Sequence, residues 1–158
     1  MLNRKAAWAA CSLLCVATTI AIAAPKDSLE GVKCLMVAKK DANPEKSAKW
    51  KEGKVYFCCD GCLGKFSKMD DKGKEKLAAA ANHQLVATKQ YVQKGCPFSG
   101  GPIKPEFKIS VKGAEVGFCC GGCKSKAEKM KESEQIASLF GEKTFKKAKF
   151  EPAKKKDS

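Results

Sequence analysis

The chain contains the same cysteine motif twice, and this repeat restricts the possible folds more than any other feature of the sequence. FCCDGC at residues 57–62 returns as FCCGGC at residues 118–123, 61 positions later. A further cysteine precedes each motif, Cys34 in the first copy and Cys96 in the second, so that each unit reads C-x(22 or 23)-C-C-x-x-C. Internal similarity of this kind indicates two copies of a small module rather than one large core.

Alternating apolar residues predict a β-hairpin directly before each pair of adjacent cysteines. In the second copy, apolar and polar residues alternate over 107–111, and a four-residue connection at 112–115 leads to a strand that ends at Phe118. The first copy has the same frame, with its connection at 51–54. Each hairpin is therefore expected to run straight into its paired cysteines.

A helix and a closing strand are expected after each motif. The apolar residues between 63 and 69 share one helical face, and Asp60 is a candidate cap for this helix. Alternation over 85–93 predicts a third strand, with 144–150 as its weaker equivalent. The fold class is therefore α+β, and each module is so small that a metal or disulfides would have to help its core hold together.

Residues 1–23 predict a secretory signal peptide. A positively charged start precedes a short apolar run at 6–22, and an A-x-A cleavage site follows at 21–23. The run is marginal for a membrane span, which needs roughly 20 apolar residues. We therefore expect export to the periplasm or the extracellular space, with Cys11 and Cys15 discarded in the cleaved peptide.

The charge of the chain also bears on its partners. The formal net charge is +14, carried mostly by lysine, and such a charge could attract nucleic acid or an anionic surface. The lysines are dispersed rather than arranged along one helix, and an exported protein meets little nucleic acid. We therefore expect a solvated lysine-rich surface, a disordered tail at 151–158, no nucleic-acid partner, and membrane contact only through the signal peptide.

The eight cysteines beyond the predicted signal peptide are consistent with two kinds of cross-link, disulfide bonds or thiolate metal sites. An even count in a small exported chain normally indicates disulfides, and four cysteines per module allow three pairings. Adjacent cysteines count against this framework in part, because a bond between neighbours is strained. A cysteine pair at a strand-to-helix turn with a distant third thiol is typical of a thiolate metal site. A helix N-terminus beside Cys62 and Cys123 would lower the pKa of both thiols and favour the ligating thiolate.

The absence of histidine from both motifs narrows the choice of metal. His83 is the only histidine, is not repeated, and is interpreted as an exposed or capping residue between a helix and a strand. Thiolate sites without imidazole select soft or borderline ions. The expected cofactor is therefore a thiophilic ion, Zn(II) or Cu(I).

The cysteines of each motif differ in their expected roles. Neighbours on a strand point to opposite faces, so Cys58 and Cys59 can reach one ion only if the chain turns immediately after them. Otherwise Cys59 and Cys120 are buried small hydrophobic residues, and each site has three thiolates and an open position. The predicted ligands are the first triad, Cys34, Cys58 and Cys62, and the second triad, Cys96, Cys119 and Cys123, with Cys59 and Cys120 as candidate fourth ligands.

In each unit a lone cysteine is followed, about 20 residues later, by an aromatic residue and a C-x3-C motif. This frame resembles the TRASH domain, a small cysteine module proposed for trafficking, resistance and sensing of heavy metals. It is also similar to the related YHS domain. The cysteines of both triads fall on the three cysteines of the family. The resemblance implies a treble-clef-like knuckle fold and metal coordination by these residues in each copy. The chain departs from the family in its long first spacing and in Ala127, which replaces the aromatic residue retained at Phe66.

Three functions are consistent with these features. The first is a non-catalytic, exported protein that carries, buffers or senses thiophilic metal ions, together with a metal-trafficking or envelope partner. The second is a structural pair of zinc- or disulfide-stapled modules that binds other proteins. The third, a thiol-disulfide oxidoreductase, fits least because the modules are too short for a thioredoxin-like domain. The expected modules span 28–93 and 94–150.

Overall fold

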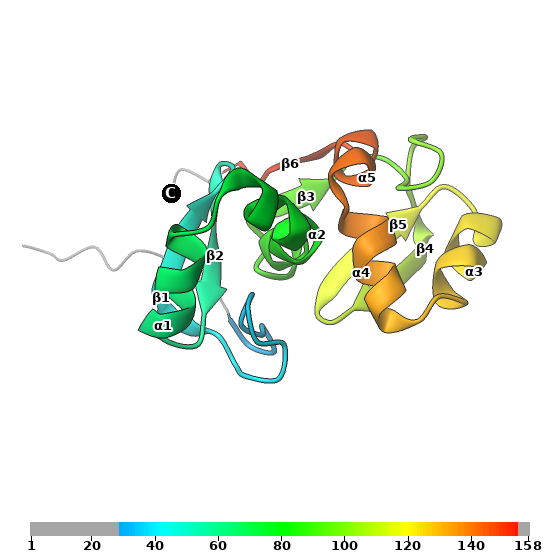
Figure 1. The fold of residues 1–158 in the computed structure, drawn as a ribbon. Helices are drawn as coiled ribbons and strands as arrows, with labels where there is room; N and C mark the ends of the chain where they lie inside the picture. Colours follow the sequence, from blue (N-terminus) through cyan, green and yellow to red (C-terminus); the bar gives the residue numbers. More distant parts are fainter. Residues whose placement is uncertain (1–28, 155–158) are drawn as a thin grey trace, which may run out of the picture.

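The structure, a computed structural model, describes residues 29–154 of the 158-residue chain. In that part of the chain the fold is mixed α/β, with five helices and three two-stranded antiparallel sheets (Figure 1). This agrees with the predicted α+β class, whereas the signal peptide at 1–23 lies outside the described residues. In chain order the elements are β1 (Asn43–Trp50), β2 (Gly53–Phe57), α1 (Asp60–Ser67), α2 (Asp71–Ala87), β3 (Tyr91–Gln93), β4 (Lys104–Val111), β5 (Ala114–Phe118), α3 (Gly121–Glu128), α4 (Glu132–Phe140), α5 (Glu142–Lys147) and β6 (Phe150–Pro152).

Both predicted hairpins are present, but their connections contain two residues rather than four. Trp50 pairs with Gly53 in the first hairpin, and Val111 pairs with Ala114 in the second. The first residue of each connection has a positive φ, 51° at Lys51 and 44° at Lys112. Two-residue hairpin turns need this conformation because it matches the right-handed twist of the strands. The expected four-residue connections at 51–54 and 112–115 are therefore wrong.

The segments after the motifs are more helical than predicted. A second helix, α2, includes the first three residues of the strand expected over 85–93, so that only Tyr91–Gln93 is extended. The segment expected as a strand over 144–150 begins inside α5, and only its last residue is in β6. Asp60 is the first residue of α1 rather than its N-cap, which is Cys59. Near residue 85 burial does not alternate, because Gln84, Leu85 and Val86 of α2 are all buried, and both Leu85 and Val86 belong to the same hydrophobic cluster.

The short closing strands join the two halves of the chain. β3 pairs with β6 in an antiparallel arrangement, and Val92 lies opposite Glu151 (Figure 1). The prediction that a disordered tail begins at residue 151 is therefore wrong, because Glu151 and Pro152 belong to β6. None of the helices in residues 29–154 combines the length and apolar character that crossing a bilayer requires.

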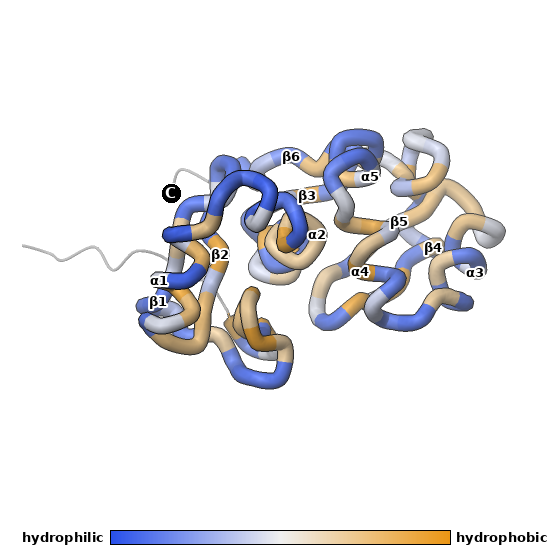
Figure 2. The backbone as a smooth tube through the Cα atoms, viewed as in Figure 1, coloured by the Kyte–Doolittle hydropathy of each residue, from blue (hydrophilic) through white to orange (hydrophobic). Residues whose placement is uncertain are grey.

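The core consists of two hydrophobic clusters, one for each cysteine site. The smaller cluster surrounds β2 and includes Phe57, Phe66 and Cys34. The larger cluster surrounds β5, and it also buries Leu85 and Tyr91 from the first half of the chain. Figure 2 shows hydrophobic residues along β2 and β5, with hydrophilic residues at the outer turns. The second cluster is thus completed by residues from both repeats.

A buried amide connects the two halves through polar contacts. Asn82 of α2 has no exposed surface, and its Oδ1 accepts a hydrogen bond of 3.0 Å from the Trp50 indole. Its Nδ2 donates to the carbonyl of Phe140 at 2.9 Å and to the carboxylate of Glu142 at 3.0 Å. The Lys51 ammonium lies 2.9 Å from the same carboxylate. One side chain therefore links the first hairpin to α4 and α5.

His83 lies within α2 rather than between a helix and a strand, as the sequence had suggested. Its Nε2 is 2.8 Å from the Val111 carbonyl, and its ring packs edge-on against Phe140 at 5.0 Å. Burial lowers the pKa of His83, with a smaller lowering effect from Lys112, and the hydrogen bond to Val111 only partly opposes this. The residue belongs to the interface between the repeats and to neither triad.

His83 makes the stability of the fold dependent on pH. The unfolded chain takes up a proton on this side chain near pH 6.5, whereas the folded chain does so only at lower pH. The free energy of unfolding should therefore be highest above pH 7 and decrease below pH 6.5, by at most about 1.4 kcal/mol per pH unit. Urea unfolding at pH 7.5 and 5.5 should show this decrease to be smaller in His83→Gln, which retains a donor for Val111. Equal decreases in both proteins would refute the assignment.

Candidate metal centre

The first cysteine of the first triad lies in a loop that is fixed against the hairpin. The Cys34 N–H donates to the Lys40 carbonyl at 2.8 Å, and an isolated bridge joins Lys33 to Asp41 at the base of the loop. The N–H of Leu35 donates to the Tyr56 carbonyl at 3.1 Å. These bonds hold Cys34 beside the end of β2, with only 3% of its surface exposed.

The other two sulfurs of the triad come from the strand-to-helix turn. Cys58 follows the last residue of β2, and Cys62 lies in the first turn of α1. The Sγ atoms of these two residues are 3.7 Å apart. The three sulfurs of Cys34, Cys58 and Cys62 all lie within 4.8 Å of one another. The prediction that a loop and a knuckle bring sulfurs from three places together is thus confirmed for the first copy.

The second copy repeats this arrangement with a tighter loop. The Cys96 N–H donates to Gly101 at 2.8 Å, and the Cys96 carbonyl accepts from Gly100 at 2.7 Å. Gly100 has a φ of +78°, a conformation that residues with a side chain rarely adopt. The sulfurs of Cys96, Cys119 and Cys123 lie within 4.8 Å of one another. Both triads are therefore close enough to hold a metal ion, and coordination itself stays a prediction.

The second residue of each cysteine pair is exposed, so the alternative that Cys59 and Cys120 are buried hydrophobic residues is wrong. Cys59 and Cys120 are the N-caps of α1 and α3, and each Sγ lies 3.8 Å from the preceding cysteine sulfur. Four thiolates around zinc, with Zn–S bonds of about 2.3 Å, have sulfur–sulfur distances of about 3.8 Å. Neither residue belongs to the group of three sulfurs that are mutually close. Each lies beside its triad at the solvent side.

The buried cysteine of each triad is in an environment that favours its thiolate. Burial by itself would raise the pKa of Cys34, but backbone N–H groups of Cys58, Met36 and Val37 outweigh it, so the pKa is lowered. For Cys96, the opposing effect of burial is again outweighed, and the pKa falls to about 6. Hydrogen bonds directed at a sulfur stabilise its charged form, so these two positions are suited to ligation.

The helix N-termini act on different cysteines from the ones predicted. Burial, together with hydrogen bonds and repulsion among the neighbouring sulfurs, raises the pKa of Cys62 and of Cys123 to about 12. The pKa of Cys59 and of Cys120 is instead lowered, mainly by the backbone N–H of the cysteine three residues later and then by neighbouring thiols. The N-cap side chain is the one nearest to the free N–H groups of the first helical turn. The expected lowering at Cys62 and Cys123 is therefore wrong.

A serine hydroxyl distinguishes the second site from the first. Ser99 donates to the Cys119 sulfur at 3.2 Å, and its side chain and N–H also lower the pKa of Cys96. The first loop reads CLMV where the second reads CPFS, so Val37 occupies the corresponding position. Ser99 was not among the predicted site residues, although its hydroxyl lies three residues after a candidate ligand in the sequence.

The fold and the site together define a class: an α+β protein with two repeat-related cysteine triads, in which all eight described cysteines are free thiols. No protein-family model matches the chain, and neither the curated proteins nor the solved structures contain a match. The TRASH/YHS resemblance and the treble-clef assignment therefore stay predictions.

Proposed function

We propose that this chain is a non-catalytic protein that binds one thiophilic metal ion at each cysteine triad, in order to carry, buffer or sense that ion. The observation that supports this most is the meeting of three sulfurs within 4.8 Å in both repeats. The sulfurs of each triad come from a loop, a strand end and a helix, which are separate in the sequence. Two such meetings at equivalent positions are difficult to explain by packing alone.

The donor atoms favour soft or borderline ions. Each triad offers sulfur alone, and His83 is engaged with Val111 in the interface between the repeats. Thiolate ligands without imidazole or carboxylate select Cu(I), Zn(II) and heavier thiophilic ions over magnesium or calcium. Three thiolates match a trigonal Cu(I) site, and recruitment of Cys59 or Cys120 as a fourth ligand would match zinc.

The wider setting proposed from the sequence is consistent with this role. A TRASH/YHS-like identity would account for the loop, knuckle and helix that surround each triad. A signal peptide at 1–23 would place the protein in the periplasm or outside the cell, where a metal-trafficking or envelope protein would exchange ions with it. The exposed thiols of Cys59 and Cys120 are where such a partner could first contact a bound ion.

A structural role for the metal is the second candidate, and one observation favours it. Cys34 and Cys96 are 3% and 0% exposed, and each is part of a hydrophobic cluster. An ion held there would also stabilise the fold of a small module, as structural zinc does. The rate of metal exchange separates the two candidates, because a carrier must release its ion and a structural site need not.

The stoichiometry of metal and thiols tests the proposal. The full chain, purified without oxygen and offered Zn(II) or Cu(I), should retain one ion per triad, as measured by elemental mass spectrometry. The eight described cysteines should react with a thiol reagent after chelation and be protected before it. Protein that retains no metal and shows no free thiols would instead support a disulfide scaffold and refute the proposal. Exchange with isotopically labelled metal within minutes would indicate a carrier, and exchange over days would indicate a structural ion.

A further inference from the structure

At the outer edge of β5, the backbone N–H and C=O of Glu115 have no hydrogen-bond partner among residues 29–154, whereas those of its neighbour Gly117 do. The N–H of Gly117 donates to Gln93 Oε1 at 2.8 Å, and Gln93 Nε2 donates to the Gly117 carbonyl at 2.9 Å. Gly117 therefore directs its backbone away from β4. Alternate residues of a strand direct their N–H and C=O groups to the same side, so Glu115 also directs its groups outward. The edge of β5 is open at Glu115.

The first repeat shows what kind of group this position accepts. Lys54 is the counterpart of Glu115, and its N–H donates to Gln90 Oε1 at 2.7 Å while Gln90 Nε2 donates to its carbonyl at 2.8 Å. The amide of Gln90 thus takes the place of a neighbouring strand on β2. No side chain in residues 29–154 forms such a pair with Glu115. In the described part of the second repeat, no side-chain amide takes the position at Glu115 that Gln90 takes at Lys54 in the first repeat.

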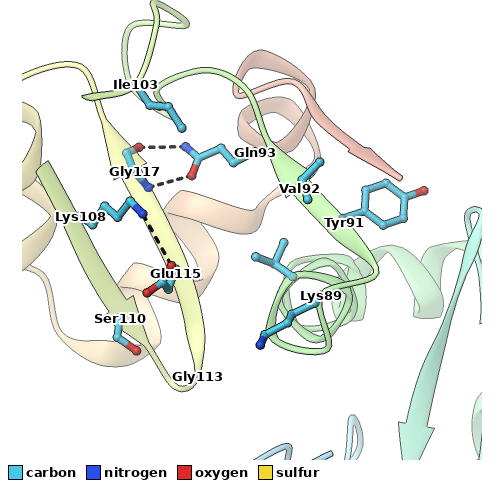
Figure 3. A pocket seen from close by; sticks show the side chains of 11 residues that line it. Lys89, Tyr91, Val92, Gln93, Ile103, Lys108, Ser110, Gly113, Glu115 and Gly117 are labelled. Atoms are coloured by element: carbon cyan, nitrogen blue, oxygen red, sulfur yellow. Dashed lines mark hydrogen bonds and ion pairs between the residues drawn. The ribbon is translucent and has the colours of Figure 1, made fainter. Parts of the chain in front are cut away.

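A second strand, β3, borders the same space as β5. Ala153 donates to the Gln90 carbonyl at 2.9 Å, and Val92 lies opposite Glu151 in the β3–β6 ladder. By the same alternation, Tyr91 turns its backbone N–H and C=O away from β6. Figure 3 shows Gln93 crossing from β3 to Gly117, while the Tyr91 ring points away from the space between the strands.

A groove lies between these two edges. Its volume is about 720 Å³, and it is lined by residues of β3, β4 and β5 together with Val86 and Ile103. Val92, at 40% exposure, is one of two exposed large hydrophobic residues in the described part of the chain, and it also lines the groove. An apolar lining between two unpaired strand edges has the features of a site for an added strand.

We propose that this groove binds an extended, acidic peptide segment of a partner protein, which pairs with the open edge of β5 at Glu115. The backbone of the segment would supply the amide that Gln90 supplies in the first repeat, and its apolar side chains would contact Val92 and Ile103. This inference does not depend on metal binding, because none of the eight described cysteines lines the groove.

The charges around the groove determine the sign of the charge that a bound segment should have. Lys89 and Lys108 line it together with Glu115, and the Lys108 ammonium lies 3.8 Å from the Glu115 carboxylate. Lys89 is exposed, and none of the ion pairs within residues 29–154 includes it. The groove therefore has one uncompensated positive charge in a chain whose net charge is +14. Complementary charge favours an acidic segment over a basic one.

The test uses three short peptides and the isotope-labelled full chain under reducing conditions. The probes are acetyl-Val-Glu-Val-Glu-Val-amide, its lysine analogue, and the acidic peptide with alternate backbone nitrogens methylated. Amide-resolved NMR should show the acidic peptide shifting the signals of Glu115 and Tyr91 and slowing their hydrogen exchange. The methylated peptide should bind at least about tenfold more weakly, because it cannot donate to the strand edge. The lysine analogue should also bind more weakly, with a difference that shrinks in salt.

A matched pair of variants separates the groove from the general positive charge. Lys89 and Lys149 both follow a helix with positive φ values of 58° and 49°, but only Lys89 lines the groove. Lys89→Glu should weaken binding of the acidic peptide at least about fivefold, while Lys149→Glu should leave it nearly unchanged. The proposal is overturned if both variants weaken binding equally, if the methylated peptide binds as well as its parent, or if the signals of Glu115 and Tyr91 do not move. It is also overturned if these signals depend on protein concentration alone, which would indicate a second copy of this chain in the groove.

Discussion

Replacing Cys34 by serine is expected to abolish metal binding at the first triad while the second triad keeps its ion. Cys34 supplies one of the three mutually close sulfurs of the first triad, and a hydroxyl is a poor ligand for a thiophilic ion. Loss of a residue that merely orients a ligand costs about 10- to 100-fold in affinity, so loss of the ligand itself should cost at least about 100-fold. Competition with a chromophoric chelator should show that the full chain loses one of two tight sites.

The repeat provides its own controls for this experiment. Cys96→Ser should remove the second site and leave the first, and the double variant should remove both. Cys59→Ser should reduce the affinity of the first site less than Cys34→Ser does, because Cys59 lies outside the triad. Circular dichroism and the occupancy of the unaltered site establish that each variant is folded. If Cys34→Ser binds two ions as tightly as the parent chain, Cys34 is not a ligand.

Replacing Asn82 by alanine is expected to destabilise the whole described fold by about 3 kcal/mol. The change removes three hydrogen bonds and leaves the Trp50 indole N–H and the Phe140 carbonyl without their partner. An unsatisfied buried group costs about 1–3 kcal/mol. The better helix propensity of alanine offsets only about a few tenths of a kcal/mol of this loss. Urea unfolding followed by tryptophan fluorescence would measure the loss.

Asn43→Ala is the matched control for this prediction. Within residues 29–154, the Asn43 side chain accepts a single exposed hydrogen bond, of 2.9 Å, from the N–H of Glu45. Its replacement should cost less than about 1 kcal/mol, as an exposed hydrogen bond does. If the two asparagine variants were equally stable, the buried amide would not be what joins the first hairpin to α4 and α5.

The difference between the two cysteine triads could be foreseen only in part. The loop sequences CLMV and CPFS were visible from the start, but contact of Ser99 with the Cys119 sulfur depends on how the loop folds over the turn. The same is true of the effects on the thiols. The sequence suggested that the helix N-terminus would act on Cys62, whereas the folded turn places Cys59 as N-cap and crowds Cys62 among other sulfurs.

Several features were determined by the sequence alone because they depend on residues close together in the chain. The hairpins follow from local alternation, and the approach of Cys58 to Cys62 follows from one strand end and one helical turn. The approach of Cys34 to this turn was also predictable, because the same frame occurs twice and a module of this size needs a metal ion or disulfides to stabilise it. The triads could therefore be named from the sequence.

The tertiary structure alone decided how the repeats fit together. No local pattern specifies that β3 pairs with β6, that Asn82 reaches Phe140, or that Gln90 closes one hairpin edge while the edge at Glu115 stays open. These contacts join residues that are distant in the chain, and their energies depend on burial and on partners that local patterns do not contain. The cysteine sites are thus local products of a repeated sequence, whereas the interface and the groove arise where the two copies differ.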